Sequence, residues 1–305
     1  MNIRFFSMVL FCQFFSLLSN APSDLSPLFR GKVTFLNTIE SKNCFITYVM
    51  IDGDVYIVKQ KKRAEKQLSV VKDALAAYIA EDLNIAHQLD IISCDKIFPG
   101  KICSEWPATI ITIAPGDTVR RQRNCIYNKL RLRQWWAKAP SYNDRGLTRE
   151  IITQMTWHKQ LPLIVALDLF IGNSDRHCGN LFYEEETDSF CAIDMDDTFN
   201  KDLCALACEK LVSMIQKDKV SFTRKEKNAL IKVRNYLRYL AVRYKPRDLI
   251  NKLYYFARKA GFIPGAKIYS KSVAKKLNLF EEMIIKSHRS AYELIALLDE
   301  IVAKR

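Results

Sequence analysis

Residues 173–180 read Asn-Ser-Asp-Arg-His-Cys-Gly-Asn and gather, in one short segment, side chains that can carry out chemistry. They directly follow an apolar run, residues 161–172, whose composition predicts a buried helix. A connection between elements needs only turn formers such as Asn, Ser and Gly. This one adds a carboxylate, a fixed cation, an imidazole and an amide, at Asp175, Arg176, His177 and Asn180. These residue types indicate a functional loop.

The spacing of these residues indicates phosphate chemistry. Asp175 and Asn180 have the D-x-x-x-x-N spacing of the kinase catalytic loop. Further along, the apolar residues 190–193 predict a strand that ends in Asp194, and an Asp there beside an Asn can hold a divalent ion on phosphates. Earlier in the chain, Lys59 ends another apolar segment and can point toward phosphate oxygens. Phosphoryl transfer needs this set: a lysine for the phosphates, ligands for Mg²⁺ and a carboxylate at the acceptor hydroxyl.

The elements around these residues change type along the chain. Three segments rich in β-branched and aromatic residues predict strands: 33–36, 44–51 and 55–58. Asp52-Gly53 predicts a hairpin turn, and residues 68–83 have the apolar spacing of a helix. Residues 108–113 predict one more strand. Beyond them the chain reads as mainly helical, and Thr223-Arg-Lys-Glu226 is a capping box that opens a helix. A small sheet with one helix should precede a larger helical lobe.

Composition limits the class of protein. Hydrophobic residues make up 49% of the 305 residues and charged residues 26%, which is typical of a folded chain and excludes global disorder. The net charge of +14 predicts attraction to anions such as nucleotides, acidic lipids or nucleic acid. Nine cysteines are scattered without a C-x-x-C pair, which favours buried reduced thiols over a disulfide framework or a zinc site.

The N-terminal residues 1–21 have the features of an export signal. A weakly basic start precedes the uncharged apolar run 5–19, and Ser19-Asn-Ala21 fits a small-residue cleavage site. The run is shorter than the roughly 20 residues that a spanning helix needs. We expect this segment to be removed from an exported, secreted protein. The alternatives are an apolar N-terminal helix and a membrane-anchored form.

A second segment, residues 120–138, is strongly basic and contains Trp135 and Trp136. The simpler interpretation is a solvated basic helix whose tryptophans pack in the core. The functional alternative is a surface for an anionic membrane or an inositol phosphate. The segment predicts no specific nucleic-acid partner.

Two motifs resemble a known family. Residues 171–180, followed by Ala192-Ile-Asp-Met-Asp-Asp-Thr-Phe199, resemble the phosphatidylinositol 3-/4-kinase family, which carries a D-R-H-x-x-N loop and an I-D-x-G-x-x-F metal strand. The loop is also similar to the N-x-D-x-H-x-x-N pattern of HipA-type kinases. The resemblance implies an α+β, two-lobed protein-kinase-like fold. Residues 30–113 would then form the β-rich N-lobe and residues 114–305 the helical C-lobe with the catalytic loop and metal strand.

The resemblance also implies roles in the loop and the metal strand. Asp175 would orient or deprotonate the acceptor hydroxyl, and Asn180 and Asp194 would bind Mg²⁺. His177 would be a structural or transition-state partner, with a simple packing role as the alternative. Arg176, which shares this catalytic segment, is better explained as a loop anchor paired with a carboxylate.

The N-lobe roles follow in the same way. Lys59 would bind the phosphates of ATP, with Asp73 as its acidic partner and Glu81 as the alternative. No Gly-rich loop precedes Lys59, but Ser41 lies in the turn 40–43, where lipid kinases often have a Ser-bearing loop. Ile113, at the end of the last predicted strand, would be the hinge residue against which adenine rests.

Two departures from the family pattern bear on function. Asp196 stands where the family has Gly, and Lys201 is the only basic residue shortly after Asp194, which counts against a phosphoinositide substrate. We therefore expect an ATP- and Mg²⁺-dependent kinase that phosphorylates a hydroxyl of a protein or a lipid. The alternative is a catalytically inactive kinase-like module that binds nucleotide or an anionic surface.

Overall fold

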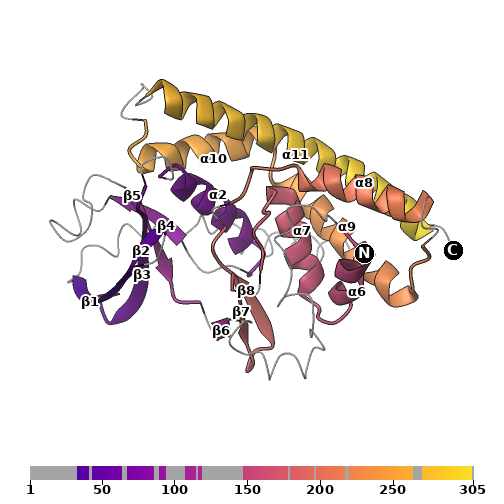
Figure 1. Ribbon diagram of the computed structural model, residues 1–305, viewed down its shortest axis with the longest axis horizontal. Coiled ribbons are helices and arrows are strands. Elements are labelled where there is room, and N and C mark those ends of the chain that lie inside the picture. Colours follow the sequence, from indigo (N-terminus) through magenta and orange to yellow (C-terminus); the bar gives the residue numbers. More distant parts are fainter. Residues whose placement is uncertain are drawn as a thin grey trace, which may run out of the picture.

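The computed structural model describes residues 33–40, 43–63, 67–85, 89–93, 107–114, 116–118, 147–177, 179–195, 197–216, 220–263 and 270–303. A sheet lies at one end of the molecule and helices make up the other end (Figure 1). The predicted α+β fold, with a β-rich N-terminal part and a helical C-terminal part, is confirmed. The predicted signal segment, Ser41, Asp196 and the basic segment 120–138 lie outside the described residues.

The N-terminal sheet has five antiparallel strands in the order β1-β2-β3-β5-β4. Their bounds are β1 Val33–Glu40, β2 Cys44–Ile51, β3 Asp54–Lys61, β4 Leu89–Ser93 and β5 Pro107–Thr112. The predicted hairpin turn joins β2 to β3, and both Asp52 and Gly53 have the positive φ that a tight two-residue turn requires. Strand β4 was not predicted, because its five residues are too short to show a period.

A second, three-stranded sheet is separate from the first. It contains β6 Asp117–Thr118, β7 Leu181–Glu184 and β8 Ser189–Ala192. The N-lobe boundary expected after residue 113 thus falls between β5 and β6, which belong to different sheets. The antiparallel pairing of β7 with β8 brings Leu181 opposite Ala192, and this register places the two ends of the hairpin beside each other.

The helical part is built from α6 Arg149–Met155, α7 Leu161–Ile171, α8 Leu203–Gln216, α9 Arg224–Arg243, α10 Pro246–Lys259 and α11 Lys271–Ala303. Every residue of α7 is buried, as its apolar composition predicts. Helix α9 begins with the predicted capping box, in which Thr223 and Glu226 satisfy each other's backbone N–H groups. None of the described helices combines the length and the apolar character needed to cross a membrane.

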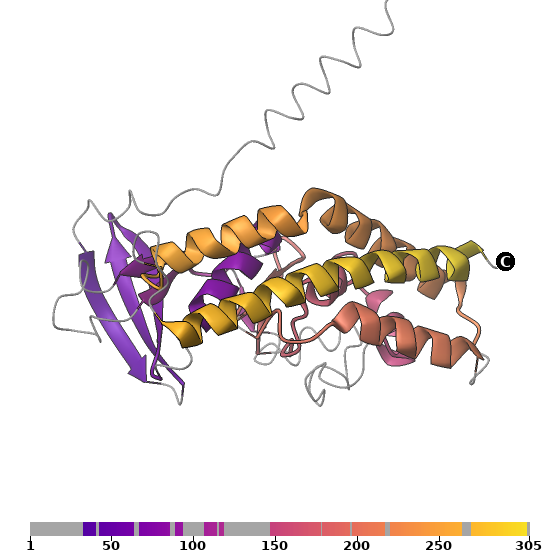
Figure 2. The same cartoon turned by 90° about the horizontal axis from the view of Figure 1, so that it is seen from above.

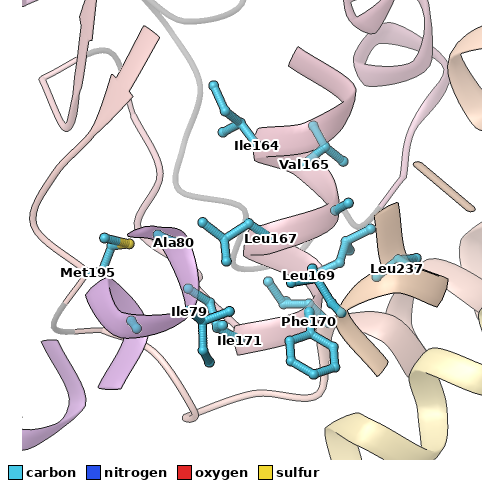
Figure 3. Packing of buried hydrophobic residues seen from close by; sticks show 14 of the residues in the cluster. Ile79, Ala80, Ile164, Val165, Leu167, Leu169, Phe170, Ile171, Met195 and Leu237 are labelled. Carbon is cyan, nitrogen blue, oxygen red and sulfur yellow. The ribbon is translucent and has the colours of Figure 1, made fainter. Parts of the chain in front are cut away.

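Helix α2, Ser69–Glu81, packs into the helical core although it lies between strands in the sequence. Figure 3 shows Ile79 and Ala80 of α2 beside Leu167 and Ile171 of α7. The sheet has a separate hydrophobic cluster, formed by Val49, Ile51, Tyr56, Val58, Ile92, Ala108 and Ile110. The described residues thus form two hydrophobic clusters, and α2 belongs to the helical one.

Helix α11 runs along the long axis of the molecule, from the end with the sheet to the far helical end, and α10 lies beside its half nearer the sheet (Figure 2). Helix α10 packs against α2 and β4, and α11 packs against α8 and α9. Among the described cysteines, Cys44, Cys191, Cys204 and Cys208 are free thiols. The first three are buried, as expected for reduced cysteines in a core.

Candidate active site

The loop that contains Asp175 begins at a sharp exit from α7. Gly172 caps the helix in the left-handed region, with a φ of 62°. A Cβ atom on Gly172 would lie 2.2 Å from the backbone oxygen of Lys201. Only glycine fits this close approach at a positive φ. The residues from Asn173 onward are thus directed away from the helix and toward the β7–β8 hairpin.

Arg176 anchors the loop from inside the protein. Its guanidinium is buried and forms a two-pronged ion pair with Asp168 of α7, with N–O distances of 3.0 and 3.1 Å. Its remaining nitrogen donates to the backbone oxygens of Asn180 and Ile193, at 2.6 and 2.9 Å. One side chain therefore connects α7, the loop and the segment after β8. Arg176 shares the segment of the predicted catalytic residues and was interpreted as a loop anchor paired with a carboxylate. It forms this pair with Asp168 and is too buried to contact a substrate, so it is a positioning residue.

Asp175 is half-buried on this anchored loop. Its backbone N–H donates to Asn173, and its backbone oxygen accepts from the side-chain amide of Asn180. Within the described residues, its carboxylate accepts no hydrogen bond. Burial raises the pKa of Asp175 above its ordinary value, and the negative charges of Asp197 and Asp194 add to the effect against the attraction of His177. A rigidly held carboxylate with a raised pKa suits a general base.

Asn180 and Asp194 lie at the two open ends of the β7–β8 hairpin. The backbone N–H of Ile193 donates to the backbone oxygen of Asn180, which holds the segment before β7 to the segment after β8. Asp194 has a positive φ of 52°, so the chain turns away from the strand direction at this residue. The Asn180 side chain gives its amide N–H to Asp175, and its oxygen accepts no hydrogen bond from a described residue. That oxygen is available to a ligand.

Lys59 of β3 forms an ion pair with Asp194, which is distant in sequence. The Lys59 side chain is only 12% exposed, while that of Asp194 is 38% exposed. Burial opposes the positive charge, but Asp194 and then Asp73 outweigh it, so the pKa of Lys59 is raised. Lys59 in turn lowers the pKa of Asp194 against the effect of burial. The pair connects the five-stranded sheet to the loop and hairpin.

Asp73 was the predicted acidic partner of Lys59, and it lies beside the Lys59–Asp194 pair as a second acidic group. The buried carboxylate of Asp73 accepts a hydrogen bond from the backbone of Met195 at 3.0 Å and acts on Lys59 as a second nearby charge. Glu81, the alternative, lies about 12 Å further along α2 at 1.5 Å per residue, and Lys252 of α10 is the cation that acts on it. The sequence missed the Lys59–Asp194 contact because only the fold brings β3 to this segment.

The other predicted site residues have simpler surroundings. Ile113 follows β5 and is 50% exposed, so an apolar side chain faces solvent where the first sheet ends. The ring of His177 accepts the backbone N–H of Gly179 through Nδ1 at 3.0 Å, which places its proton on Nε2 and stabilises the turn. This contact supports a structural role for His177.

Three residues near the site were missed by the sequence interpretation. Lys61 lies two residues after Lys59 on the same side of β3 and is almost fully buried. Lys72 of α2, also buried, donates to Asn200. Asp197 accepts hydrogen bonds from Ser174 at 2.6 Å and from Asn200. Hydrogen bonds therefore connect Lys72 of α2, through Asn200 and Asp197, to Ser174 of the loop. The sequence signal that could have identified Lys61 and Lys72 is a charged residue within an otherwise apolar strand or helix.

Asn180 and Asp194 offer the oxygen ligands that Mg²⁺ prefers, but two residues supply fewer ligands than its octahedral coordination needs. Mg²⁺ sites of nucleotide enzymes commonly use one or two carboxylates together with phosphates and water. The described residues contain no group of three or more His, Cys, Asp or Glu that could hold a metal ion. Among the described residues, Asn180 and Asp194 would therefore hold a metal together with the phosphates of a nucleotide.

Two solved structures with low sequence identity are similar to this chain. The Helicobacter pylori proinflammatory kinase CtkA is 15% identical, with a TM-score of 0.47 over 86% of this chain and 96% of that chain. A chain in the Shewanella oneidensis MR-1 toxin antitoxin complex of HipA, HipB and operator DNA is 12% identical, with a TM-score of 0.45 over 90% of this chain and 66% of that chain. No protein-family model and no curated protein matches the chain. At these TM-scores the likeness does not single out the phosphatidylinositol 3-/4-kinase family, and function must be inferred from the site.

Proposed function

We propose that this protein is an ATP- and Mg²⁺-dependent phosphotransferase of the atypical kinase type. The observation that carries the proposal is the ion pair between Lys59 of the sheet and Asp194, beside the loop with Asp175 and Asn180. This arrangement puts a largely buried cation, two residues with oxygen ligands and a carboxylate that accepts no hydrogen bond from the described residues in one region. A module that only bound nucleotide would have no need for the carboxylate of Asp175.

In this proposal, ATP binds between the sheet and the β7–β8 hairpin. The exposed side chain of Ile113 offers an apolar surface for adenine. Lys59 of β3 would bind phosphate oxygens, and Asn180 and Asp194 would hold the Mg²⁺. When bound, the metal neutralises charge on the β- and γ-phosphates. Lys59 then exchanges its contact with Asp194 for the phosphates.

The transfer step assigns the proton to Asp175. The acceptor hydroxyl oxygen forms a bond to the γ-phosphorus, and the bond from that phosphorus to the β–γ bridging oxygen breaks, so ADP leaves. The hydroxyl proton passes to the Asp175 carboxylate. The raised pKa of Asp175 favours this proton transfer. Arg176 contributes by holding the loop in place.

The finer parts of the proposal rest on the sequence. The acceptor is a hydroxyl of a protein or a lipid, and the D-R-H-x-x-N loop supports a relation to the phosphatidylinositol 3-/4-kinases. Residues 1–21 support export of the protein, and the basic segment 120–138 supports contact with an anionic membrane or an inositol phosphate.

Two substitutions test the chemistry, because loss of Asp194 and loss of Asp175 should have different effects on nucleotide binding and on transfer. Asp194→Ala removes a metal ligand, so ATP binding should lose its dependence on Mg²⁺ and transfer should stop. Asp175→Asn preserves shape and should leave Mg²⁺-ATP affinity unchanged, while transfer falls by about 10²–10⁴-fold. Transfer is measured with labelled ATP and separate protein and lipid acceptors, and affinity by calorimetry.

The matched control is Asp54→Asn, which removes one carboxylate at the exposed β2–β3 hairpin. It should change neither affinity nor transfer. If Asp175→Asn transfers phosphate at the rate of the unchanged protein, Asp175 is not the base and the mechanism is wrong. If the unchanged protein binds no Mg²⁺-ATP, the proposed function itself fails.

A further inference from the structure

The groups of the proposed nucleotide site belong to two packing units. Lys59 lies on the sheet, whose hydrophobic cluster is separate from the helical core. Asp73 lies on α2, which packs in the helical core, and Met195, the neighbour of Asp194, packs there as well. The spacing between the lysine and the two carboxylates therefore depends on how the sheet is attached to the helical part.

Strand β4 is the part of the sheet that enters both clusters. Ile91 packs in the helical core and Ile92 packs in the sheet cluster, since successive side chains of a strand point to opposite faces. β4 is also an edge strand, next to β5 alone. A contact that holds β4 thus controls the position of the sheet relative to α2.

The C-terminal helix α10 makes such a contact. Lys259, its last residue, donates to both carboxylate oxygens of Asp90 in β4, at 2.6 and 2.5 Å. Asp90 is only 6% exposed, so the pair is largely shielded from solvent. The Asp90 carboxylate also accepts the backbone N–H of Ile91 at 2.8 Å, which fixes its orientation.

The other end of α10 is fixed to the end of α2. Tyr244, just before α10, donates its hydroxyl hydrogen to Asp82, which also pairs with Arg243. In the middle of α10, Lys252 lies over the ring of Tyr78 of α2, 4.7 Å from its centroid. Helix α10 is therefore attached along α2 and reaches the sheet through Lys259, a course that Figures 1 and 2 show.

We propose that Lys259 is a positioning residue for the nucleotide site, because its pair with Asp90 sets the position of the sheet, and so of Lys59, relative to Asp73 and Asp194. Lys259 does not contact nucleotide in this proposal. The inference rests on the proposed function, and it makes the C-terminal helices part of the nucleotide-binding assembly.

The test measures ATP binding and transfer for Lys259→Met, with Arg258→Met as the control. Arg258 is the adjacent residue, is exposed and makes no ion pair with the described residues, so the control removes the same charge from the same helix. Lys259→Met should weaken Mg²⁺-ATP binding and raise KM by about tenfold, which corresponds to about 1.4 kcal/mol of binding free energy. The value of kcat should change less than twofold, because the reacting groups are intact. Arg258→Met should bind ATP normally.

Two further variants separate positioning from a purely structural role. Lys259→Arg keeps the charge and should restore ATP affinity to within about threefold. Asp90→Asn should weaken ATP binding as Lys259→Met does, and the double variant should be no worse than either single one, since both remove the same contact.

The outcomes distinguish this inference from the proposed function. If the unchanged protein binds no nucleotide, the proposed function is wrong and the inference falls with it. If the unchanged protein binds Mg²⁺-ATP and folded Lys259→Met binds it equally well, only the inference is wrong. If Lys259→Met and Asp90→Asn both fail to fold, the pair is a folding contact and the positioning role is rejected.

Discussion

Replacing Arg176 with Met should be among the most destabilising single changes in the helical part. The substitution leaves the carboxylate of Asp168 buried with no countercharge, and Asp168 is 0% exposed. It also removes the donor that the backbone oxygens of Asn180 and Ile193 share. The remaining partner of Asp168 is the amide of Asn173, at 2.9 Å.

The magnitude follows from which groups lose their partners. Breaking a buried ion pair from one side costs about 3–5 kcal/mol, because the other charge stays desolvated. The backbone oxygen of Ile193 loses its Arg176 donor as well, whereas that of Asn180 keeps the N–H of Ile193. These losses overlap with that of the ion pair, because one side chain supplies all the donors. We therefore expect a loss of about 4–5 kcal/mol in the free energy of unfolding, against a total of about 5–15 kcal/mol for a typical protein.

The assay is urea unfolding followed by circular dichroism, with Arg149→Met as the matched control. Arg149 pairs with the buried carboxylate of Glu226, but Arg149 itself is 38% exposed. Glu226 also keeps hydrogen bonds from Thr223 and Thr153. The control should lose only about 1 kcal/mol. A loss below 1.5 kcal/mol for Arg176→Met would refute the claim that this side chain holds the loop to α7.

Two more predictions concern α2 and the exit from α7. Burial lowers the pKa of Lys72 to about 8 despite the charge of Asp197, so its charged form destabilises the fold below that pH. Between pH 8 and 10 the free energy of unfolding should therefore rise relative to that of Lys72→Met, by about 1–3 kcal/mol. Urea titrations that give the same difference between the two proteins at both pH values would contradict this. Gly172→Ala should cost about 2–4 kcal/mol in the same assay, because the methyl group meets Lys201 in a left-handed conformation. Gly261→Ala, with a φ of 78° and no atom near the added methyl, should cost about 1 kcal/mol, and equal losses at the two glycines would show that the close approach to Lys201 is unimportant.

The sequence predicted the elements whose signals are local. The hairpin at Asp52-Gly53 follows from residues that tolerate positive φ, and the start of α9 follows from the capping box at Thr223. Helix α7 was predictable because its apolar run is uninterrupted except for Asp168. That lone carboxylate in a buried helix was itself a signal for a cationic partner. Arg176 was interpreted as an anchor, but the sequence did not identify Asp168 as its partner.

The sequence by itself also determined which chemical groups the protein has: Lys59, Asp175, Asn180 and Asp194 are present in an order that suits phosphoryl transfer. Only the tertiary structure decided how they meet. Lys59 forms an ion pair with Asp194 across 135 residues of chain, and the predicted Asp73 acts on it as a second nearby charge. Such contacts depend on the packing of whole elements, which local periodicity and turn residues do not encode.

The same reason explains why the packing partners of α2 and α10 could not be predicted from the sequence. The period of α2 shows that it is a helix with apolar faces, but not that these faces pack in the helical core instead of on the sheet. The pair between Lys259 and Asp90 joins residues 169 positions apart, and each alone reads as an ordinary charged residue. Burial of Asp90 and the direction of α10 turn that pair into a connection between the two parts of the molecule, because a shielded ion pair holds its elements in place while an exposed one is exchanged for water.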